Sequence, residues 1–259
     1  MSTQYNVTLV TGPAGGGKST LIKLLRHNVT DDPRRIVNID SSKCLENSRN
    51  YASATGLRLM NLLEDQAEGR LLPAKLVVQS VMENLEWIRQ RRIEVLHYLI
   101  AGCPRTQEEV QEWIRISRGG GITFRVLIIN CTKEQLRQGI ESRINQGITR
   151  ADDNAIEQRW NEYLTKTRTI QDILKNDMFA NTSRSDTLVE RLRTLVNLMD
   201  IPSNVRSRWM RRLDEKTHPV HREIQNIESG NISLPIQVPA RKSFRPLEYS
   251  SMQQHRVAF

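Results

Sequence analysis

The residues that point most directly to chemistry stand near the N-terminus, where Gly12-x-x-x-x-Gly17-Lys18-Ser19 forms a glycine-rich loop. This spacing matches the Walker A pattern, in which backbone N–H groups surround phosphate oxygens. In such a loop the lysine binds the terminal phosphates and the serine hydroxyl binds Mg²⁺. The residues expected to contact a nucleotide are Gly12, Pro13, Ala14, Gly15, Gly16, Gly17, Lys18, Ser19 and Thr20, with Ser19 as the metal ligand.

The sequence around this loop predicts the elements that position it. Val7 to Val10 is a short apolar run typical of a strand, and Ser19 to Arg26 has the composition of a helix. A strand followed by a loop and a helix is the context in which a Walker A loop works. A plain glycine-rich turn is the alternative, and the complete motif in this context favours the phosphate-binding loop.

Strands and helices alternate along the chain to about residue 200. Short apolar runs predict further strands at residues 35–39, 95–100, 124–129 and 178–180. Apolar residues spaced by three or four predict helices at 56–67, from 73, at 107–117, after 132, from 156 and at 188–199. Residues 40–53 are polar, and we expect them to be irregular. This alternation predicts an α/β fold with a parallel sheet covered by helices on both faces.

Cysteine usage and hydropathy narrow the class of protein. Cys44, Cys103 and Cys131 are odd in number and lack CxxC spacing, which argues against a disulfide framework or a zinc site. No apolar run is long enough to span a bilayer, and the first residues lack the layout of a signal peptide. We therefore expect a soluble, cytoplasmic protein with no membrane partner.

The segment from residue 201 to residue 259 is basic. It carries ten Lys or Arg against five Asp or Glu, and therefore five of the nine net positive charges. Residues 206–215 have the composition of a basic helix, whereas scattered prolines and the lack of apolar periodicity predict that residues 218–259 are mostly disordered. A basic extension of this kind can bind RNA or an acidic protein, or it can simply be solvated.

Three further stretches, taken together with the loop, resemble the adenylate kinase family of nucleoside monophosphate kinases. Gly-Arg-Leu-Leu-Pro-Ala-Lys-Leu-Val at residues 69–77 resembles the segment that ends the family's NMP-binding insertion. Gly-Cys-Pro-Arg-Thr at residues 102–106 resembles the motif after its third core strand, and residues 150–163 resemble the exit of its lid. The four stretches follow the family's order.

The resemblance implies a P-loop NTPase fold of three layers (αβα) around a central parallel sheet. It implies a domain of residues 1–200, with a helical NMP-binding insertion at about residues 41–75 and a short lid at about residues 144–152. Residues 201–259 then form a basic, largely disordered C-terminal extension. The implied cofactors are ATP and Mg²⁺, and the implied substrate is a nucleoside monophosphate, with AMP as the first candidate.

The resemblance also implies roles for individual residues. Those that would neutralise the phosphates during in-line transfer are Lys18, Arg105, Arg143, Arg150 and Arg159. Among them, Arg105 would hold the acceptor, which is also implied to contact Lys43, Leu72, Val77, Gly102 and Glu109. Arginine suits this task because its planar fork stays charged and binds phosphate oxygens in pairs. Each arginine also has a plainer interpretation as a solvated side chain on a turn or a helix face.

The sequence departs from the family's pattern where the metal and the acceptor are held. Ala101 replaces an acidic residue, Glu109 replaces a base-reading glutamine, and an additional lid arginine is missing near Gly147. In the poorly aligning segment at residues 40–43, we expect Lys43 to replace the arginine that binds the acceptor phosphate and Asp40 to supply a carboxylate. Three hypotheses follow. The chain is an ATP-dependent nucleoside monophosphate kinase, a catalytically weak P-loop module whose basic extension binds RNA or a protein, or a GTPase, for which no Asn-Lys-x-Asp motif is present.

Overall fold

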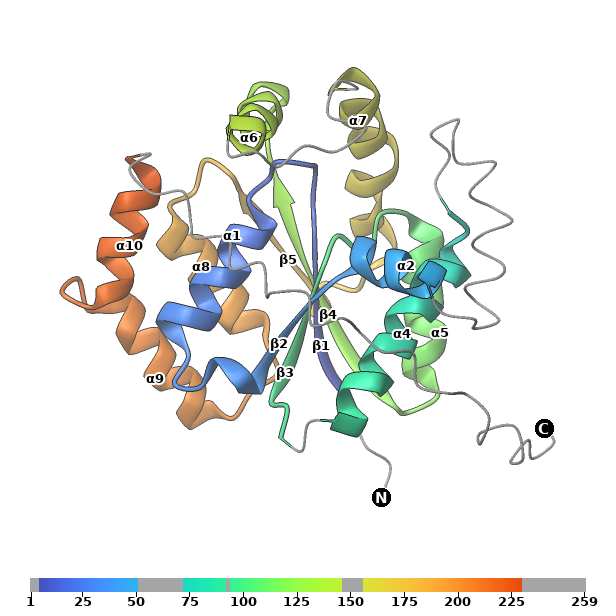
Figure 1. The fold of residues 1–259 in the computed structure, drawn as a ribbon, viewed down its shortest axis with the longest axis horizontal. Coiled ribbons are helices and arrows are strands. Elements are labelled where there is room, and N and C mark those ends of the chain that lie inside the picture. Colours follow the sequence, from blue (N-terminus) through green and yellow to red (C-terminus); the bar gives the residue numbers. More distant parts are fainter. Residues whose placement is uncertain (1–4, 51–71, 92–93, 146–155, 230–259) are drawn as a thin grey trace.

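A computed structural model describes residues 5–50, 72–91, 94–145 and 156–229 of the chain. Its centre is a five-stranded sheet of order β2-β3-β1-β4-β5, in which every neighbouring pair is parallel (Figure 1). The strands are β1 (Tyr5–Thr11), β2 (Ile36–Asp40), β3 (His97–Ala101), β4 (Ile122–Asn130) and β5 (Phe179–Ser183). The five apolar runs of the sequence therefore form the strands, and the expected α/β fold is confirmed.

Helices cover both faces of the sheet (Figure 1). One face packs against α1 (Lys18–Leu24), its π-helical continuation (Leu25–Val29) and α8 (Leu188–Leu198). The other face packs against α4 (Ala74–Arg91), α5 (Gln107–Arg118) and a 3-10 segment (Arg168–Ile173). Alternation along the strands divides the core, because Val10 points to the α1 side and Leu9 to the α5 side.

Two further helices, α6 (Lys133–Asn145) and α7 (Ile156–Glu162), stand at the edge where the strands end (Figure 1). A capping box begins α6, since the Thr132 hydroxyl accepts the Gln135 N–H at 3.2 Å and the Gln135 side chain accepts the Thr132 N–H at 3.0 Å. An ion pair between Lys133 and Glu157 joins the two helices.

The segment after β2 is helical, which corrects the expectation that residues 40–53 are irregular. Helix α2 (Ser41–Asn50) follows the strand directly. The Asp40 carboxylate accepts the Ser42 N–H at 2.9 Å, as a side chain at the start of a helix does. Cys44, which is buried, anchors the helix to the core on the α4 side.

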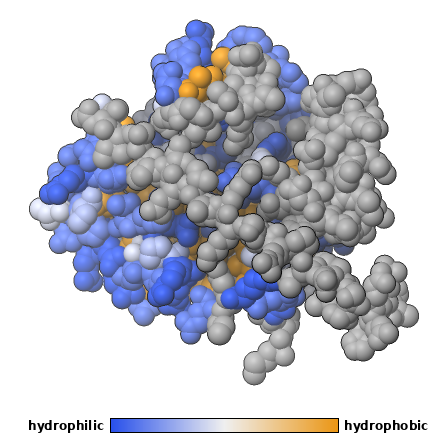
Figure 2. Space-filling model, in the orientation of Figure 1, coloured by the Kyte–Doolittle hydropathy of each residue, from blue (hydrophilic) through white to orange (hydrophobic). Residues whose placement is uncertain are grey.

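The expectation of a largely disordered extension from residue 201 is wrong for residues 203–228, because these residues form two helices. They form α9 (Ser203–Asp214), which matches the basic helix predicted there, and α10 (Pro219–Glu228), which was not predicted. The side chains that these helices bury in the α1 side of the core are Trp209, Leu213, Val220 and Ile224. Hydrophilic side chains cover their outer surface (Figure 2). The folded unit therefore continues past residue 200 at least to Glu228.

Several expectations fall outside the described residues. They are the helix at residues 56–67, most of the lid at 144–152 with Arg150, much of the insertion at 41–75 and the end of the chain from residue 230. Within the part that the structure describes, no helix is both long enough and apolar enough to cross a membrane.

Replacing Trp209 by alanine tests whether α9 belongs to the folded unit. The side chain is 2% exposed, so its removal should lower the free energy of unfolding by about 3–5 kcal/mol, the usual cost of deleting a buried aromatic ring. Urea denaturation measures this loss. Arg211→Ala, which changes an exposed residue of the same helix, is the control and should leave the midpoint unchanged. Equal midpoints for the two variants would contradict the packing.

Candidate functional site

The Walker A loop connects β1 to α1 and packs its backbone directly on β4 and α6. A Cβ atom on Gly12, whose φ is 136°, would lie 2.3 Å from the Ile129 carbonyl oxygen. A Cβ atom on Gly139 of α6 would lie 2.3 Å from the Gly15 carbonyl oxygen. No side chain fits at either contact, so glycine at both places allows the loop to touch β4 and α6.

The expected phosphate ligands of the loop lie at its open side. The Lys18 ammonium group folds over the loop and donates to the carbonyl oxygens of Gly12, at 2.9 Å, and Pro13, at 2.7 Å. An anion offers this ammonium group stronger, charge-assisted partners than neutral carbonyls. Ser19 is exposed and Thr20 is half-buried. The loop therefore presents the ammonium and hydroxyl groups that a Walker A motif uses.

Arg105 lies at the end of β3, the strand that pairs with β1 on its β2 side. Its Nε donates to the Gly102 carbonyl at 2.9 Å, and its Nη2 donates to the Ser42 hydroxyl at 3.1 Å. The surrounding loop is held by the Thr11 hydroxyl, which donates to the Pro104 carbonyl, and by the Thr167 hydroxyl, which donates to the Arg105 carbonyl at 3.2 Å. This arrangement fixes a guanidinium group between the ends of β2 and β3.

Glu109 lies beneath this loop and is 2% exposed. Its carboxylate accepts the Arg105 backbone N–H at 2.7 Å and faces the Cys103 thiol at 3.4 Å. Burial raises the pKa of the Glu109 carboxyl above its ordinary value, although the Arg105 N–H works against this shift. The carboxylate thus braces the Arg105 loop, and its expected contact with the acceptor remains a prediction.

The other residues expected at the acceptor lie in different surroundings. Lys43 is exposed on α2, Leu72 is half-buried before α4, and Val77 is buried in α4. The side chain of α2 that contacts Arg105 is Ser42, which we did not predict. Ser42 gives no distinctive signal in the sequence, since serine is common at the start of any helix.

Arg143 and Arg159 lie on α6 and α7, on either side of residues 146–155, which are outside the described part. Both side chains are half-buried. Arg143 follows Gly139 by four residues, so it occupies the helix face that contacts the Walker A loop. Arg159 precedes Tyr163 by four residues, and the Tyr163 hydroxyl donates to the Asn130 side chain at the end of β4, at 2.7 Å.

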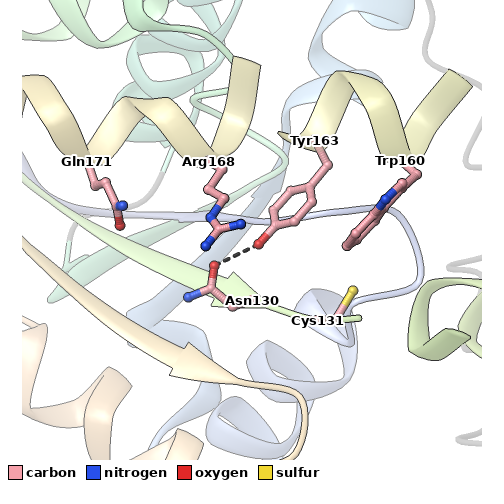
Figure 3. Close-up of a pocket in the computed structure, with 6 residues that line it drawn as sticks. All are labelled: Asn130, Cys131, Trp160, Tyr163, Arg168 and Gln171. Atoms are coloured by element: carbon pink, nitrogen blue, oxygen red, sulfur yellow. Dashed lines mark hydrogen bonds between the residues drawn. The ribbon is translucent and has the colours of Figure 1, made fainter. Parts of the chain in front are cut away.

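Figure 3 shows a cavity next to this contact. Its volume is about 310 Å³, and the lining residues are Asn130, Cys131, Trp160, Tyr163, Arg168 and Gln171. The rings of Trp160 and Tyr163 lie 5.4 Å apart between centroids and form its aromatic wall. The cavity opens at the carboxyl edge of the sheet, where ligands of parallel α/β proteins bind.

Arg184 and Arg191 are two basic residues near the loop that the sequence analysis did not identify. Arg184 follows β5, and its Nη1 donates to the Gly15 carbonyl at 2.7 Å and to the Gln135 carbonyl. Arg191 lies on α8 and is 7% exposed. In the sequence Arg191 looks like one more charge on an amphipathic helix, since only the packing of α8 on α1 shows that it is buried.

The residues present fit a Mg²⁺–nucleotide complex in part. Ser19 supplies the hydroxyl ligand of a Walker A site. Ala101 supplies no carboxylate, but Asp40 pairs with it across β2 and β3 and ends its strand at the same edge of the sheet. Among the described residues, no three His, Cys, Asp or Glu side chains are grouped to hold a metal ion. A metal would therefore rely on Ser19 and on the phosphates of the nucleotide.

No protein family model matches the chain. UMP-CMP kinase 2 of Caenorhabditis elegans is 26% identical over 151 residues, which cover 58% of this chain and 71% of that protein. The human UMP-CMP kinase is 27% identical over 110 residues, which cover 41% of this chain and 55% of that protein. The zebrafish (Danio rerio) UMP-CMP kinase is 26% identical over 168 residues, which cover 63% and 81%. The chain is thus similar to these kinases at low sequence identity.

Among solved structures, a gluconokinase from Sinorhizobium meliloti 1021 matches 82% of this chain and 98% of its own. The TM-score is 0.41 and the sequence identity is 14%.

Replacing Gly139 by alanine tests the contact between α6 and the Walker A loop. The new methyl group would overlap the Gly15 carbonyl, so the helix or the loop must move. We expect a loss of about 1–3 kcal/mol in unfolding free energy, as for other overpacked sites, together with weaker ATP binding by calorimetry. Gly121→Ala is the control, because no atom lies within 4 Å of its added methyl. Unchanged ATP affinity in Gly139→Ala would show that the contact does not shape the loop.

The raised pKa of Glu109 predicts a characteristic pH dependence of stability. Because the folded state holds this proton more tightly than the unfolded state, the contribution of Glu109 to stability falls as pH rises from the unfolded pKa through the folded pKa. Compared with Glu109→Gln, the wild type should therefore lose unfolding free energy over this range in urea titrations.

Glu108→Gln provides an internal control of opposite sign. A hydrogen bond from the Thr106 side chain lowers the pKa of the exposed Glu108 carboxyl. The wild type should thus gain stability relative to this variant as pH rises through the folded and then the unfolded pKa. If both differences had the same slope, the assignment of the raised pKa to burial of Glu109 would be wrong.

Proposed function

We propose that the chain is an ATP-dependent nucleoside monophosphate kinase. The observation that carries the proposal is the position of the Walker A loop and Arg105 at the ends of the adjacent strands β1 and β3. The loop is suited to the polyphosphate of a donor, and the guanidinium group is suited to the phosphate of an acceptor. The similarity to UMP-CMP kinases supports the same reaction.

In this proposal the chain positions two phosphates and neutralises their charge. An acceptor phosphate would lie against Arg105 and the Ser42 hydroxyl, with an oxygen directed at the γ-phosphorus held by Lys18. The bond from this oxygen to phosphorus forms as the bond to the β,γ-bridging oxygen breaks, and the electron pair leaves with ADP. No covalent enzyme intermediate is required, since positioning and electrostatics supply most of the catalysis in such transfers.

Arg143 and Arg159 would add positive charge from the two helices that flank residues 146–155, and Arg150 would add it from within that segment. Ser19 would hold Mg²⁺ through its hydroxyl, and the metal would supply positive charge against the phosphates of ATP. The described residues also give Asp40 as a carboxylate at the acceptor side of the sheet edge.

The relatives favour UMP and CMP over AMP as the acceptor. The curated proteins that the chain matches are UMP-CMP kinases, whereas the sequence motifs led us to place AMP first. We therefore propose a pyrimidine nucleoside monophosphate as the preferred acceptor and AMP as the second.

A panel of nucleotide pairs tests the proposal. Protein given Mg·ATP with UMP, CMP, AMP or GMP should produce the matching diphosphate. Chromatography of the reaction mixture measures this product. Lys18→Ala should lower the rate by about 100-fold or more, because it removes a charge that stabilises the transferring group. Arg105→Met should weaken the use of the monophosphate while ATP binding stays unchanged.

Arg115→Met is the control for the arginine variant, since Arg115 is exposed on α5 and pairs with Glu112. Its rates should equal those of the wild type. No diphosphate with any acceptor would refute the kinase, and a rate that survives Lys18→Ala would belong to a contaminant.

The absence of a carboxylate at Ala101 favours one second candidate, a P-loop module that binds ATP without rapid transfer. In that case ATP binds, exchange with every acceptor is negligible, and the basic C-terminal residues bind RNA with an affinity that falls steeply with salt. In the described part of that segment, Arg208 and Arg212 already pair with Asp31 of the core, which lowers the charge left for a partner.

A further inference from the structure

Arg191 is a buried charge with no hydrogen-bond or ion-pair partner among the described residues. It is 7% exposed, and its guanidinium forms no hydrogen bond or ion pair with any residue that the structure describes. Its Nε is fully enclosed and lacks an acceptor. Burying an unpaired guanidinium costs folding energy, so such a residue is better explained by a ligand than by stability.

The side chain of Arg191 points to the Walker A loop. Its Nη1 would lie 3.2 Å from a Cβ atom placed on Gly17, the residue immediately before Lys18. Arg184 approaches the same loop from the end of β5, where its Nη1 donates to the Gly15 carbonyl. Two guanidinium groups thus converge on the six-residue loop between β1 and α1, in addition to the Lys18 ammonium group.

The guanidinium groups of Arg184 and Arg191 form no ion pair with a carboxylate that the structure describes. Burial, followed by repulsion from Arg184, lowers the pKa of Arg191, and the attraction of Asp186 and Glu228 only partly offsets this. Neither carboxylate forms an ion pair with Arg191. Asp186 instead accepts hydrogen bonds from Thr182 and from the Ser183 backbone. An anion at the loop would remove this imbalance.

The sheet topology assigns the two sides of the loop to different ligands. Arg105 follows β3, which lies on one side of β1, and α8 follows β5, which lies beyond β4 on the other side. Arg105 therefore lies on the β3 side of β1, and Arg191 lies on the β4 and β5 side. If Arg105 holds the acceptor, a phosphate next to Arg191 belongs to the donor.

We propose that Arg191, with Arg184 beside it, binds a phosphate of the donor nucleotide at the Walker A loop. This inference deepens the proposed kinase function and rests on it for the identity of the donor as ATP. Arg191 and Arg184 would supply positive charge at the loop in addition to the charge of Lys18.

Calorimetric binding of ATP and of inorganic tripolyphosphate to Arg191→Met tests the proposal. Methionine keeps the length and the apolar stem but removes the charge. Loss of one charge-assisted contact to phosphate should weaken both ligands by about tenfold or more, and Arg191→Lys should lie between this variant and the wild type. Arg193→Met is the control, since Arg193 lies on the same helix and pairs with Asp214 at 2.7 Å, away from the loop.

The unliganded variants separate a ligand contact from a structural role. With no anion present, Arg191→Met should unfold in urea at the same midpoint as the wild type or at a higher one, because an unpaired buried charge has been removed. Tripolyphosphate affinity equal to that of the wild type, or no binding to the wild type, overturns the proposal. So does a large loss of unliganded stability in both Arg191→Met and Arg191→Lys. Tripolyphosphate binding that depends on Arg191 without phosphoryl exchange would refute the kinase and leave this inference standing.

Discussion

The contact of the Walker A backbone with β4 and α6 constrains every other part of the site. Gly12 touches the Ile129 carbonyl, and Gly15 touches Gly139, at distances that exclude any side chain. The loop, the end of β4 and the middle of α6 therefore form one closely packed body. This body fixes the helix that carries Arg143 and leaves the Gly15 carbonyl where Arg184 reaches it. A parallel sheet supplies the rest, because all its strands end at one edge.

Positive charge is the second organising feature of this edge. Lys18 and Arg184 satisfy their donors with backbone carbonyls, and Arg105 uses a carbonyl and a hydroxyl. Carbonyls and hydroxyls cancel no charge, so these contacts leave the guanidinium charges of Arg105 and Arg184 without a described carboxylate partner. A polyphosphate with several negative oxygens supplies both acceptors and charge. The unliganded arrangement thus resembles a site held ready for an anion, in which ligand binding replaces neutral contacts by stronger ionic ones.

Features that depend on a local sequence signal could be predicted from the sequence. Features that arise only from tertiary packing could not. The Walker A motif and the five strands follow from glycine spacing and apolar runs, which report burial directly. Helix α10 was missed although His218 and Pro219 form a regular helix start, because its apolar positions are few and prolines follow it. Ser42 and Arg191 were missed because their roles arise only when α2 reaches Arg105 and α8 packs on α1. Glu109 was identified from its position, but its burial against Arg105 required the fold.

The packed part of the basic extension contacts the helical segment that follows the Walker A loop. In α9 the Trp209 indole N–H and the Arg212 guanidinium both donate to Asp31, and Arg212 also donates to the Val29 carbonyl at 2.6 Å. Val29 ends the helical segment that α1 begins directly after the Walker A loop. The first helix of the extension therefore clamps the far end of the element whose near end carries Lys18. Arginine has two environments in this chain, since in α9 Arg212 binds the protein's own carbonyls and carboxylates, whereas near the loop Arg191 has no hydrogen-bond partner among the described residues.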